Sequence, residues 1–403
     1  MNWPMRPINE LCELAVDCVN KTAPTVDFET EYKMIRTTNV KNGFIDLNEV
    51  RYVTEEVFQK WTRRSKPRYG DVILTREAPV GEVGRFTSDD DKIFLGQRLF
   101  HYRPNPKKLD WNYLAYALQS PSVQGRFKGM GFGATVDHVR VGDAERLPIP
   151  CPPLDVQKSI GSTLSTYDNL IENNRRRIQL LEQSARLLYK EWFVHLRFPG
   201  HEHVKIKDGV PEGWEKKTAS EVMEVLSGGT PKTTIPAYWD GDIPFFTPKD
   251  AVDYAYVAET EKTITEDGLK NCNSKLYPKD TVFITARGTV GKINLAQTDM
   301  AMNQSCYALV SKPPLNQHFL YFALVEGVEQ FRSRAVGAVF DAIIRDTFKL
   351  IPFVVPDEKL ITMFTEHVSP TLNQIDILSA QTRKLMEARD LLLPRLMNRE
   401  IPV

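Results

Sequence analysis

The same order of residue patterns occurs twice along this chain. GATVD at Gly133–Asp137 returns as GAVFD at Gly337–Asp341, with an offset of 204 residues. Upstream, VILTREAPVG at Val72–Gly81 matches VFITARGTVG at Val282–Gly291, with an offset of 210 residues. Because the repeated unit is about half of the 403-residue chain, each copy is a domain followed by a helix and not a solenoid repeat of roughly 20 to 50 residues. The duplication predicts two similar domains related by pseudo-two-fold symmetry.

Each copy ends in a run with the hydrophobic period of a long helix. Apolar residues alternate at spacings of four and three, which is the heptad pattern of a coiled coil. In the first copy the seam positions are Ile160, Leu164, Tyr167, Ile171, Asn174, Ile178, Leu181, Ala185, Leu188 and Trp192. In the second copy they are Phe364, Val368, Thr371, Ile375, Leu378, Thr382, Leu385, Arg389, Leu392 and Leu396. Two such stripes bury each other most economically, and pseudo-two-fold symmetry makes the pairing antiparallel.

The ends of these helices carry further expectations. We expect the first helix to run from about Thr166 to Arg197. Ser369-Pro370 has the form of an N-cap followed by proline at the first helical position. This dipeptide predicts that a short helix ends near His367 and that a long one begins after it. Asn174 is either a tolerated polar residue in the seam or a residue that fixes the register of the pair.

The two globular halves are predicted to be α/β (α+β) with a strand-rich core. In the first half we expect strands at Asp71–Thr75 and Lys92–Leu95. A helix at Trp111–Leu118 is expected to pack Leu114, Ala117 and Leu118 inward. The second half repeats this order, with strands at Val282–Thr285 and Ser305–Ser311 and a helix at Phe319–Leu324.

Composition indicates a globular cytoplasmic protein. The chain is 42% hydrophobic and 26% charged, and it has no run of 18 apolar residues. The N-terminus MNWPMRPINELCEL lacks the basic and apolar regions of a signal peptide. The five cysteines share no CxxC spacing, so neither a disulfide framework nor a zinc site is indicated. We therefore expect a cytoplasmic location, no membrane partner and no metal.

Charge is balanced overall but concentrated locally. The 52 Lys and Arg residues equal the 52 Asp and Glu residues, which argues against a simple electrostatic binder of nucleic acid. Lys60–Tyr69 nevertheless gathers five positive charges and two aromatic residues without an acid, and Lys270–Lys279 is the equivalent stretch. Either stretch is a solvated loop before a strand or a phosphate contact, and recurrence favours the second. The candidate phosphate contacts are Lys60, Arg63, Arg64, Lys66, Arg68, Lys232, Lys275 and Lys279.

Other side chains are candidates for reading bases. Glutamine can pair bidentately with adenine in the major groove, and Gln97 and Gln304 follow equivalent strands. A glutamine repeated in both domains also suits a structural role, because residues that read different sequences should differ. The remaining candidates occupy equivalent loops and do differ: Arg36, Thr37, Asn39, Arg76, Thr247, Lys249 and Arg287. Near Lys232, the glycines of Ser227–Lys232 suit either a phosphate contact or a simple turn.

Three segments carry a family resemblance. Leu147–Phe193 resembles the first conserved helical region of the specificity subunits of type I restriction–modification systems. Pro211–Thr233 is similar to the start of the second target-recognition domain of that family. Ile351–Leu360 and Leu385–Ile401 resemble its terminal conserved region. The resemblance implies recognition domains at 1–150 and 199–356 and helical regions at 151–198 and 357–403.

The resemblance also implies a function. It indicates a non-catalytic subunit that reads double-stranded DNA, with each domain recognising one part of a split target and the helices setting the spacer. The implied partners are two modification subunits, which use S-adenosylmethionine to methylate adenine, and restriction subunits, which use ATP and Mg²⁺. This chain itself is expected to bind no cofactor.

Two alternatives from other classes are a coiled-coil assembly protein with protein-binding globular ends and a divergent DNA methyltransferase. Against the methyltransferase, the chain has no NPPY or DPPY tetrad, and Asn105-Pro106 is followed by two lysines. Gly129–Gly133 superficially resembles a cofactor loop, but it lacks an evident preceding strand and a downstream acidic partner. Pro356–Lys359 does not separate two carboxylates and a lysine enough to surround a metal. The sequence therefore predicts no catalytic centre.

Overall fold

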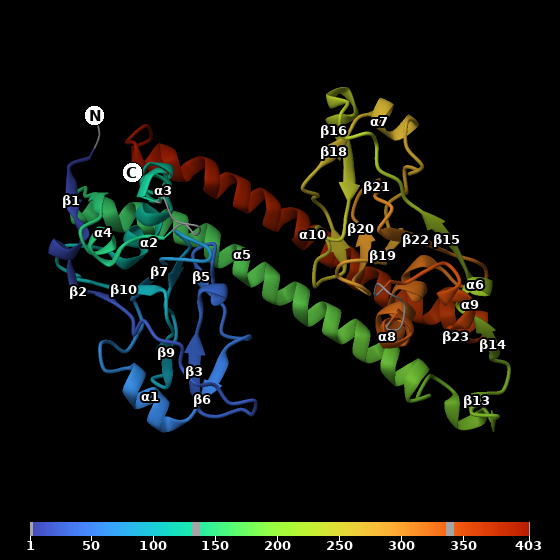
Figure 1. The fold of residues 1–403 in the computed structure, drawn as a ribbon. Coiled ribbons are helices and arrows are strands. Elements are labelled where there is room, and N and C mark those ends of the chain that lie inside the picture. Colours follow the sequence, from blue (N-terminus) through green and yellow to red (C-terminus); the bar gives the residue numbers. More distant parts are fainter. Residues whose placement is uncertain (1–2, 131–137, 336–341, 403) are drawn as a thin grey trace. The chain divides into compact units, whose positions relative to one another are not determined.

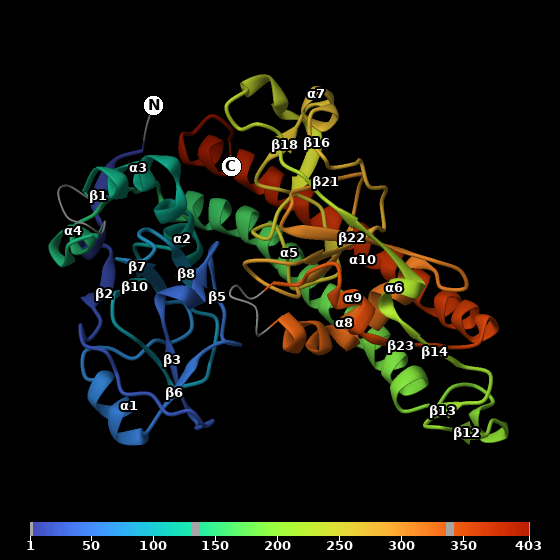
Figure 2. The same cartoon turned by 45° about the vertical axis from the view of Figure 1, so that its right-hand side comes forward.

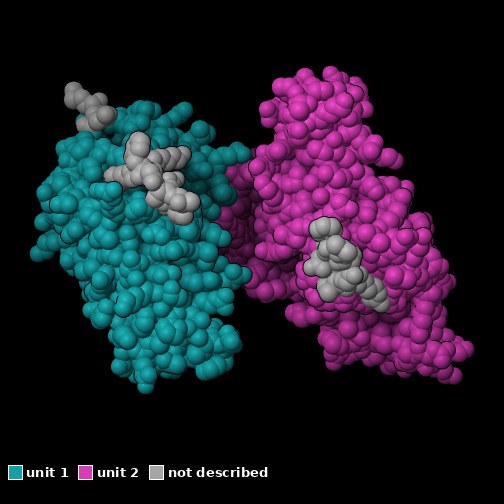
Figure 3. Space-filling model, in the orientation of Figure 1, with its two compact units in different colours: residues 1–171, 385–403 teal, residues 172–384 magenta. Residues whose placement is uncertain are grey.

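The computed structural model describes residues 3–130, 138–335 and 342–402. The repeated motifs Gly133–Asp137 and Gly337–Asp341 lie outside these residues, as does most of the glycine-rich segment 129–133. The chain divides into two compact units, which Figure 3 colours separately. Unit 1 comprises Met1–Ile171 and Leu385–Val403, and unit 2 comprises Glu172–Lys384. Both divisions fall inside long helices, so each globular domain shares its unit with a segment of each helix.

The strands described in unit 1 form two sheets, a separate strand pair and a short hairpin (Figure 1). The central sheet has the order β2 (Cys12–Asp17), β10 (Leu99–Pro104), β7 (Val72–Thr75), β8 (Val83–Arg85), and all its pairs are antiparallel. A second sheet has the order β6 (Arg51–Val53), β3 (Tyr32–Ile35), β9 (Ile93–Leu95). The N-terminal β1 (Met5–Pro7) pairs with β11 (Pro148–Pro150), which directly precedes the first long helix. A short hairpin joins β4 (Val40–Lys41) to β5 (Phe44–Ile45).

Unit 2 repeats these pairings in the same order. Its central sheet runs β15 (Met223–Ser227), β22 (Cys306–Ser311), β19 (Val282–Thr285), β20 (Ile293–Ala296), with β17 (Tyr256–Val257) added at the edge. The second sheet is β18 (Thr263–Ile264), β16 (Trp239–Phe246), β21 (Ala301–Met302). The pair that precedes the long helix is β14 (Glu215–Thr218) with β23 (Pro352–Val355). A small hairpin of β12 (Ile206–Lys207) and β13 (Val210–Pro211) comes first along the chain. The predicted strands are thus confirmed as β7, β9, β19 and β22.

Short helices complete both units. Those of unit 1 are α1 (Glu55–Trp61), α2 (Trp111–Gln119), α3 (Pro121–Met130) and α4 (Val141–Glu145). Those of unit 2 are α6 (Ala219–Val222), α7 (Glu266–Lys270), α8 (Gln317–Ala335) and α9 (Thr347–Leu350). The predicted helices are confirmed as α2 and α8, and Leu114, Ala117 and Leu118 are fully buried.

Helices α2 and α8 begin at equivalent N-cap residues. The Tyr113 amide donates to Asp110 Oδ1 at 2.8 Å, and the Phe319 amide donates to Asn316 Oδ1 at 3.0 Å. In unit 1, α2 lies beside the start of the first long helix in both views (Figures 1 and 2). Gly161 makes this approach possible, since a Cβ there would lie 2.7 Å from Asp110 Oδ1.

The long helices differ from the predicted bounds. Helix α5 spans Leu154–Tyr189 and continues as a π-helical turn over Lys190–Val194, so it starts well before Thr166. Helix α10 spans Glu358–Met397 without interruption. The predicted helix start at Ser369-Pro370 is therefore wrong. Proline in a helix removes one backbone hydrogen bond, but Phe364, Val368, Leu372 and Ile375 are buried on both sides of it. The Ser369 hydroxyl lies 3.0 Å from His318 Nδ1 of α8 and does not act as a cap.

The heptad positions lie where the two long helices pack in each unit. In unit 2 the end of α5 meets the start of α10, with the rings of Tyr189 and Phe364 5.7 Å apart. In unit 1 the start of α5 shares a core with the end of α10 through Ile160, Leu164, Leu396 and Met397. Helices α5 and α10 therefore run antiparallel to each other within each unit. Of the predicted seam, Ile171, Asn174, Ile178, Ile375 and Leu378 are buried, and Leu181, Leu188, Leu385 and Leu392 are half-buried.

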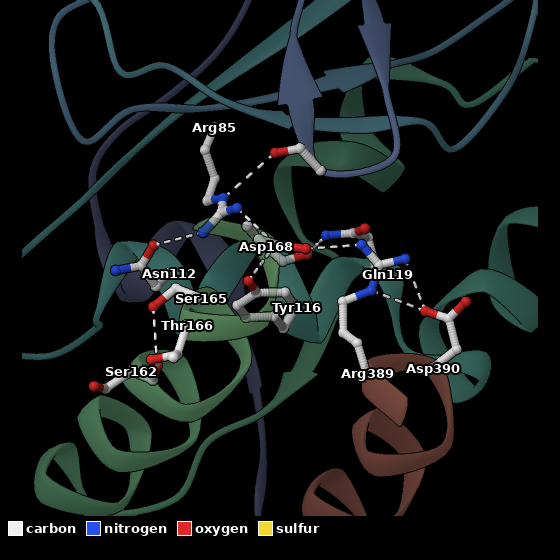
Figure 4. A network of polar contacts seen from close by, with 12 residues as sticks. Arg85, Asn112, Tyr116, Gln119, Ser162, Ser165, Thr166, Asp168, Arg389 and Asp390 are labelled. Carbon is white, nitrogen blue, oxygen red and sulfur yellow. Dashed lines mark hydrogen bonds and ion pairs between the residues drawn. The ribbon is translucent and has the colours of Figure 1, made fainter. Parts of the chain in front are cut away.

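A buried polar network joins the first domain to both long helices (Figure 4). Asp168 of α5 accepts a hydrogen bond from Arg85 Nη2 of β8 at 2.6 Å and one from Arg389 Nη1 of α10 at 2.7 Å. Tyr116 of α2 donates its hydroxyl to the same carboxylate. Arg85 Nη1 also donates to Asn112 Oδ1 at 3.1 Å. The heptad pattern did not identify Asp168, because an acidic residue was not expected on a buried face.

Unit 2 has apolar residues at all four equivalent positions. The 204-residue offset relates Asp168 to Leu372 and Arg389 to Ala185. Strand pairing relates Arg85, opposite Val72, to Leu295, opposite Val282. The equivalent caps relate Tyr116 to Phe322. These four residues, Ala185, Leu295, Phe322 and Leu372, belong to one buried cluster. The same junction is polar in unit 1 and apolar in unit 2.

Within the described residues, no helix combines the length and apolar character that a membrane span requires. All five cysteines are free thiols, and Cys18 and Cys306 are buried. Burial raises the pKa of the Cys12 thiol to about 12, with a smaller contribution from Asp71.

Candidate nucleic-acid interface

Parallel strands bring several predicted base readers to one edge of unit 1. Strands β3 and β9 run parallel, with Ile35 opposite Leu95, so their carboxyl ends open at the same side of the sheet. Arg36 and Thr37 follow β3, and Gln97 and Arg98 follow β9. These four residues line a cavity of about 200 Å³. We call these loops the reading edge of unit 1.

Unit 2 has the equivalent edge. Strands β16 and β21 are parallel, with Phe246 opposite Met302. Thr247 and Lys249 follow β16, and Gln304 follows β21. The backbones match: the Gly96 amide donates to Ile35 O at 2.8 Å, and the Asn303 amide donates to Phe246 O at 2.9 Å. The loops after β3 and β16 also match, since the Arg36 amide donates to Asn39 Oδ1 and the Thr247 amide donates to Asp250 Oδ2, both at 2.8 Å. The side chains differ, because Thr247 stands in the place of Arg36 and Pro248 in that of Thr37.

Each of the two repeated glutamines accepts a hydrogen bond from a threonine of its own domain. Thr22 Oγ1 donates to Gln97 Oε1 at 3.3 Å, and Thr230 Oγ1 donates to Gln304 Oε1. A shared contact inside each domain supports the structural interpretation of these residues. The nearby glycines also have a packing reason, because a Cβ on Gly228 would lie 2.2 Å from Asn303 O. This favours the simple turn over a phosphate cradle at Ser227–Lys232.

Two expected base readers are buried, which corrects the expectation that they face DNA. Arg76 is 4% exposed, pairs with Asp17 at 2.9 Å and donates to Val139 O at 2.9 Å. Burial raises the pKa of Asp17, and Arg76 and Arg64 oppose this effect. Asn39 is 3% exposed and accepts from the Arg36 amide at 2.8 Å. Asn39 holds the loop after β3 in place, whereas Arg76 ties the end of β7 to Asp17 and Val139.

The basic stretch of unit 1 is only partly free. Lys60 and Arg63 are exposed, and Lys60 lies over the Trp61 ring at 5.7 Å. The other three predicted phosphate contacts face acidic residues: Arg64 lies 3.6 Å from Asp17, Lys66 3.1 Å from Asp91, and Arg68 3.5 Å from Glu13. These acids are distant in sequence, so local composition did not reveal them. The exposed pairs of Lys66 and Arg68 are weak and compatible with exchange for a phosphate, whereas the carboxylate that Arg64 faces is buried.

The predicted DNA-contacting lysines and arginine of unit 2 also divide into free and paired side chains. Lys232, Lys275 and Arg287 are exposed. Lys249 is also exposed and lies 3.6 Å from Glu261. Lys279 instead pairs with Asp376 of α10, and its ammonium lies 6.0 Å from the Tyr256 ring centre. The expected phosphate contact at Lys279 is thus engaged by the helix within unit 2.

Comparisons with known proteins agree with this duplicated arrangement. The model of the type I restriction modification DNA specificity domain matches residues 1–183 and 211–375. The MjaIX type I restriction enzyme specificity subunit of Methanocaldococcus jannaschii is 24% identical over 419 residues, which cover 100% of this chain and 94% of that protein. The HindI specificity subunit of Haemophilus influenzae is 21% identical over 397 residues, covering 82% and 86% of the two chains.

A solved structure shares the fold. The type I restriction–modification S subunit from M. genitalium superposes with a TM-score of 0.60 at 20% identity, covering 98% of this chain and 96% of that one. The two matched segments coincide with the two repeated halves, so the chain is a DNA specificity protein with two copies of the specificity domain. The chain belongs to the family of type I restriction–modification specificity subunits. Members of this family are non-catalytic and work with modification and restriction subunits on DNA.

Proposed function

We propose that each globular domain of this specificity subunit reads one half of a bipartite target in double-stranded DNA. One observation carries the proposal: the two reading edges have the same backbone pairing but different side chains. Arg36 and Thr37 follow β3 in unit 1, where Thr247 and Pro248 follow β16 in unit 2. A repeated frame with divergent side chains suits two different half-sites, because base edges are distinguished by the donors and acceptors placed against them.

The two long helices set the spacer between the half-sites in this proposal. Each is continuous across the division between the units, since α5 contains Ile171 and Glu172 and α10 contains Lys384 and Leu385. A continuous helix transmits a fixed rise of about 1.5 Å per residue. The number of helical residues therefore determines the number of unread base pairs.

Modification subunits dock on the outer face of these helices. Leu180, Leu187 and Val194 are spaced seven residues apart and are 57%, 61% and 48% exposed. Leu391, which the 204-residue offset relates to Leu187, is 63% exposed. Apolar side chains repeated on an outer helix face support docking of a partner helix. The recurrence of Leu187 as Leu391 supports two modification subunits per chain, although Lys384 and Asn398 replace Leu180 and Val194 in the second half.

Catalysis belongs to the partners in this assembly. S-adenosylmethionine is used by the modification subunits, and ATP and Mg²⁺ are used by the restriction subunits. We place the complex in the cytoplasm, where DNA and these substrates are available. No residue set in this chain is assigned a catalytic or cofactor-binding role.

The test is the methylation pattern of cells that express this chain with its modification subunit. Methylated adenines should lie in a split sequence with a constant spacer. The purified chain alone should transfer no methyl group from labelled S-adenosylmethionine to DNA. Transfer by the isolated chain, or methylation at an unsplit sequence, would contradict the proposal.

A further inference from the structure

Arg98 stands out on the reading edge of unit 1. It directly follows Gln97 at the carboxyl end of β9, and its side chain is 45% exposed. Its Nε lies 3.0 Å from Glu77 Oε2, so the carboxylate occupies the inner edge of the guanidinium. The terminal Nη1 and Nη2 atoms make no hydrogen bond to any described residue. The side chain is thus held at one edge and has two free donors at the other.

The backbone fixes this position as well. The Arg76 amide donates to Arg98 O at 2.8 Å, which ties the residue to the end of β7. Arg98 has a φ of +68°, in the left-handed region that a residue with a side chain rarely adopts. Such conformations persist where the surrounding structure imposes them, and they are concentrated at functional sites. Glu77 directly follows the buried Arg76, so the backbone of both members of the pair is fixed.

We propose that Arg98 reads a guanine in the half-site of the first domain. Two parallel donors from one guanidinium match the O6 and N7 acceptors of guanine in the major groove. Glu77 supports this contact by limiting the rotation of the guanidinium, which reduces the conformational entropy lost on binding. This assignment rests on the proposed function and names the base class that one of its reading edges recognises.

The second domain lacks this pair. The Ala286 amide donates to Ser305 O at 2.8 Å, as the Arg76 amide does to Arg98 O, so Ser305 takes the place of Arg98. The repeat alignment places Arg287 where Glu77 stands. The guanine contact therefore belongs to the first half-site only, and Arg287 serves as a matched control from the equivalent edge.

The experiment compares Arg98→Ala, Arg98→Lys, Glu77→Gln and Arg287→Ala in the full chain co-expressed with its modification subunit. Target sequences are determined by methylome sequencing. Relative affinities of the purified complex for DNAs substituted at each position are then measured at several salt concentrations. Arg98→Ala should lose the preference for guanine at one position of the first half-site, by roughly 5- to 150-fold in discrimination. Glu77→Gln should lose part of it, and Arg287→Ala should leave that position unchanged.

Arg98→Lys separates recognition from charge. Lysine keeps the positive charge but presents a point donor instead of a planar fork. This variant should retain the salt dependence of the wild-type complex and still lose guanine preference, and its unfolding temperature shows whether the fold is intact. If Arg98→Ala and Arg98→Lys methylate the wild-type target with the wild-type preference, the assignment is overturned while the proposed function stands. A wild-type complex that methylates no split sequence rejects both.

Discussion

The carboxylate of Asp168 on α5 lies 2.7 Å from Nη1 of Arg389 on α10, more than 200 residues away along the chain. Its other oxygen accepts from Arg85 of the first domain at 2.6 Å. One nearly inaccessible acid therefore joins the domain to both long helices within unit 1. A buried charge is tolerated only when partners satisfy it, so the three residues depend on one another.

Replacing Asp168 by Ala should destabilise unit 1 by about 3–5 kcal/mol, because the buried Arg85 loses its counter-charge and the half-buried Arg389 keeps only Asp390. Urea unfolding followed by circular dichroism measures the change. Asp390→Ala is the matched control, since Asp390 pairs with the same Arg389 but is exposed, so its loss should cost at most about 1 kcal/mol. The combined change Arg85→Leu, Tyr116→Phe, Asp168→Leu and Arg389→Ala installs the residues of unit 2 and should recover much of the loss. An Asp168→Ala chain with wild-type stability would show that the network contributes little.

Acid should weaken the first domain through Asp71. Burial alone would raise the pKa of this carboxyl, but hydrogen bonds from His101 at 2.6 Å and Arg103 at 2.7 Å outweigh it and lower the pKa. A lowered folded-state pKa contributes stability above the unfolded value of about 4. That contribution is lost as pH falls through the folded value. Asp71→Asn should therefore be less stable at neutral pH and show a shallower loss between about pH 4 and pH 2. Parallel urea curves for the two chains across this range would contradict the expectation.

The exposed basic residues should contribute affinity without selectivity. Replacing Lys60 and Arg63 with Ala should weaken binding to all sequences alike and reduce the salt slope by about 2, roughly one per lost phosphate contact. Extending the change to Arg64 and Lys66 should add less per residue, because Asp17 and Asp91 already neutralise them. Fluorescence anisotropy over a salt series gives the slopes. An unchanged slope for the first pair would place this stretch away from DNA. Lys249→Ala should instead alter preference in the second half-site.

Lengthening both helices should change only the spacer. Inserting seven residues between Gln179 and Arg186, with a matched insertion between Arg383 and Asp390, keeps the heptad phase and adds about 10 Å to each helix. That length corresponds to about three base pairs, with a rotation of roughly 100° about the duplex. Methylome sequencing should show the original half-sites with a longer spacer, or no methylation if the rotated domain misses its groove. New half-site sequences with the old spacer would mean that the helices read bases.

Local patterns predicted the elements that depend on local interactions. The repeated VILT and VFIT runs form β7 and β19, because a short apolar run bounded by turns favours a buried strand. The heptads predicted both long helices for the same reason. The start of α5 at Leu154 and the continuity of α10 through Pro370 depend instead on tertiary burial, which overrides the intrinsic preference of a proline.

The candidate site was less predictable because its contacts are long-range. Arg76 was expected to face DNA, and Asp17, its partner, lies far earlier in the chain. Arg98 was missed because no motif surrounds it and its pairing with Glu77 appears only when two loops meet. The second half carries Ala286 in place of Arg76 and Ser305 in place of Arg98, so the repeat did not indicate either role. The duplication predicted equivalent loops in the two units, and it could not assign the role of each side chain.

The polar junction of unit 1 has a consequence for inheritance. A gene that acquires a new first domain by recombination brings the equivalent of Arg85 and Tyr116 with that domain, but Arg389 is encoded near the other end of the gene. An incoming domain built like the second one would place leucine and phenylalanine against Asp168 and leave its charge with a single arginine. Exchange at the first position is therefore restricted to donors that carry the same arginine and tyrosine. Exchange at the second position, where the junction is apolar, accepts a wider range of donors.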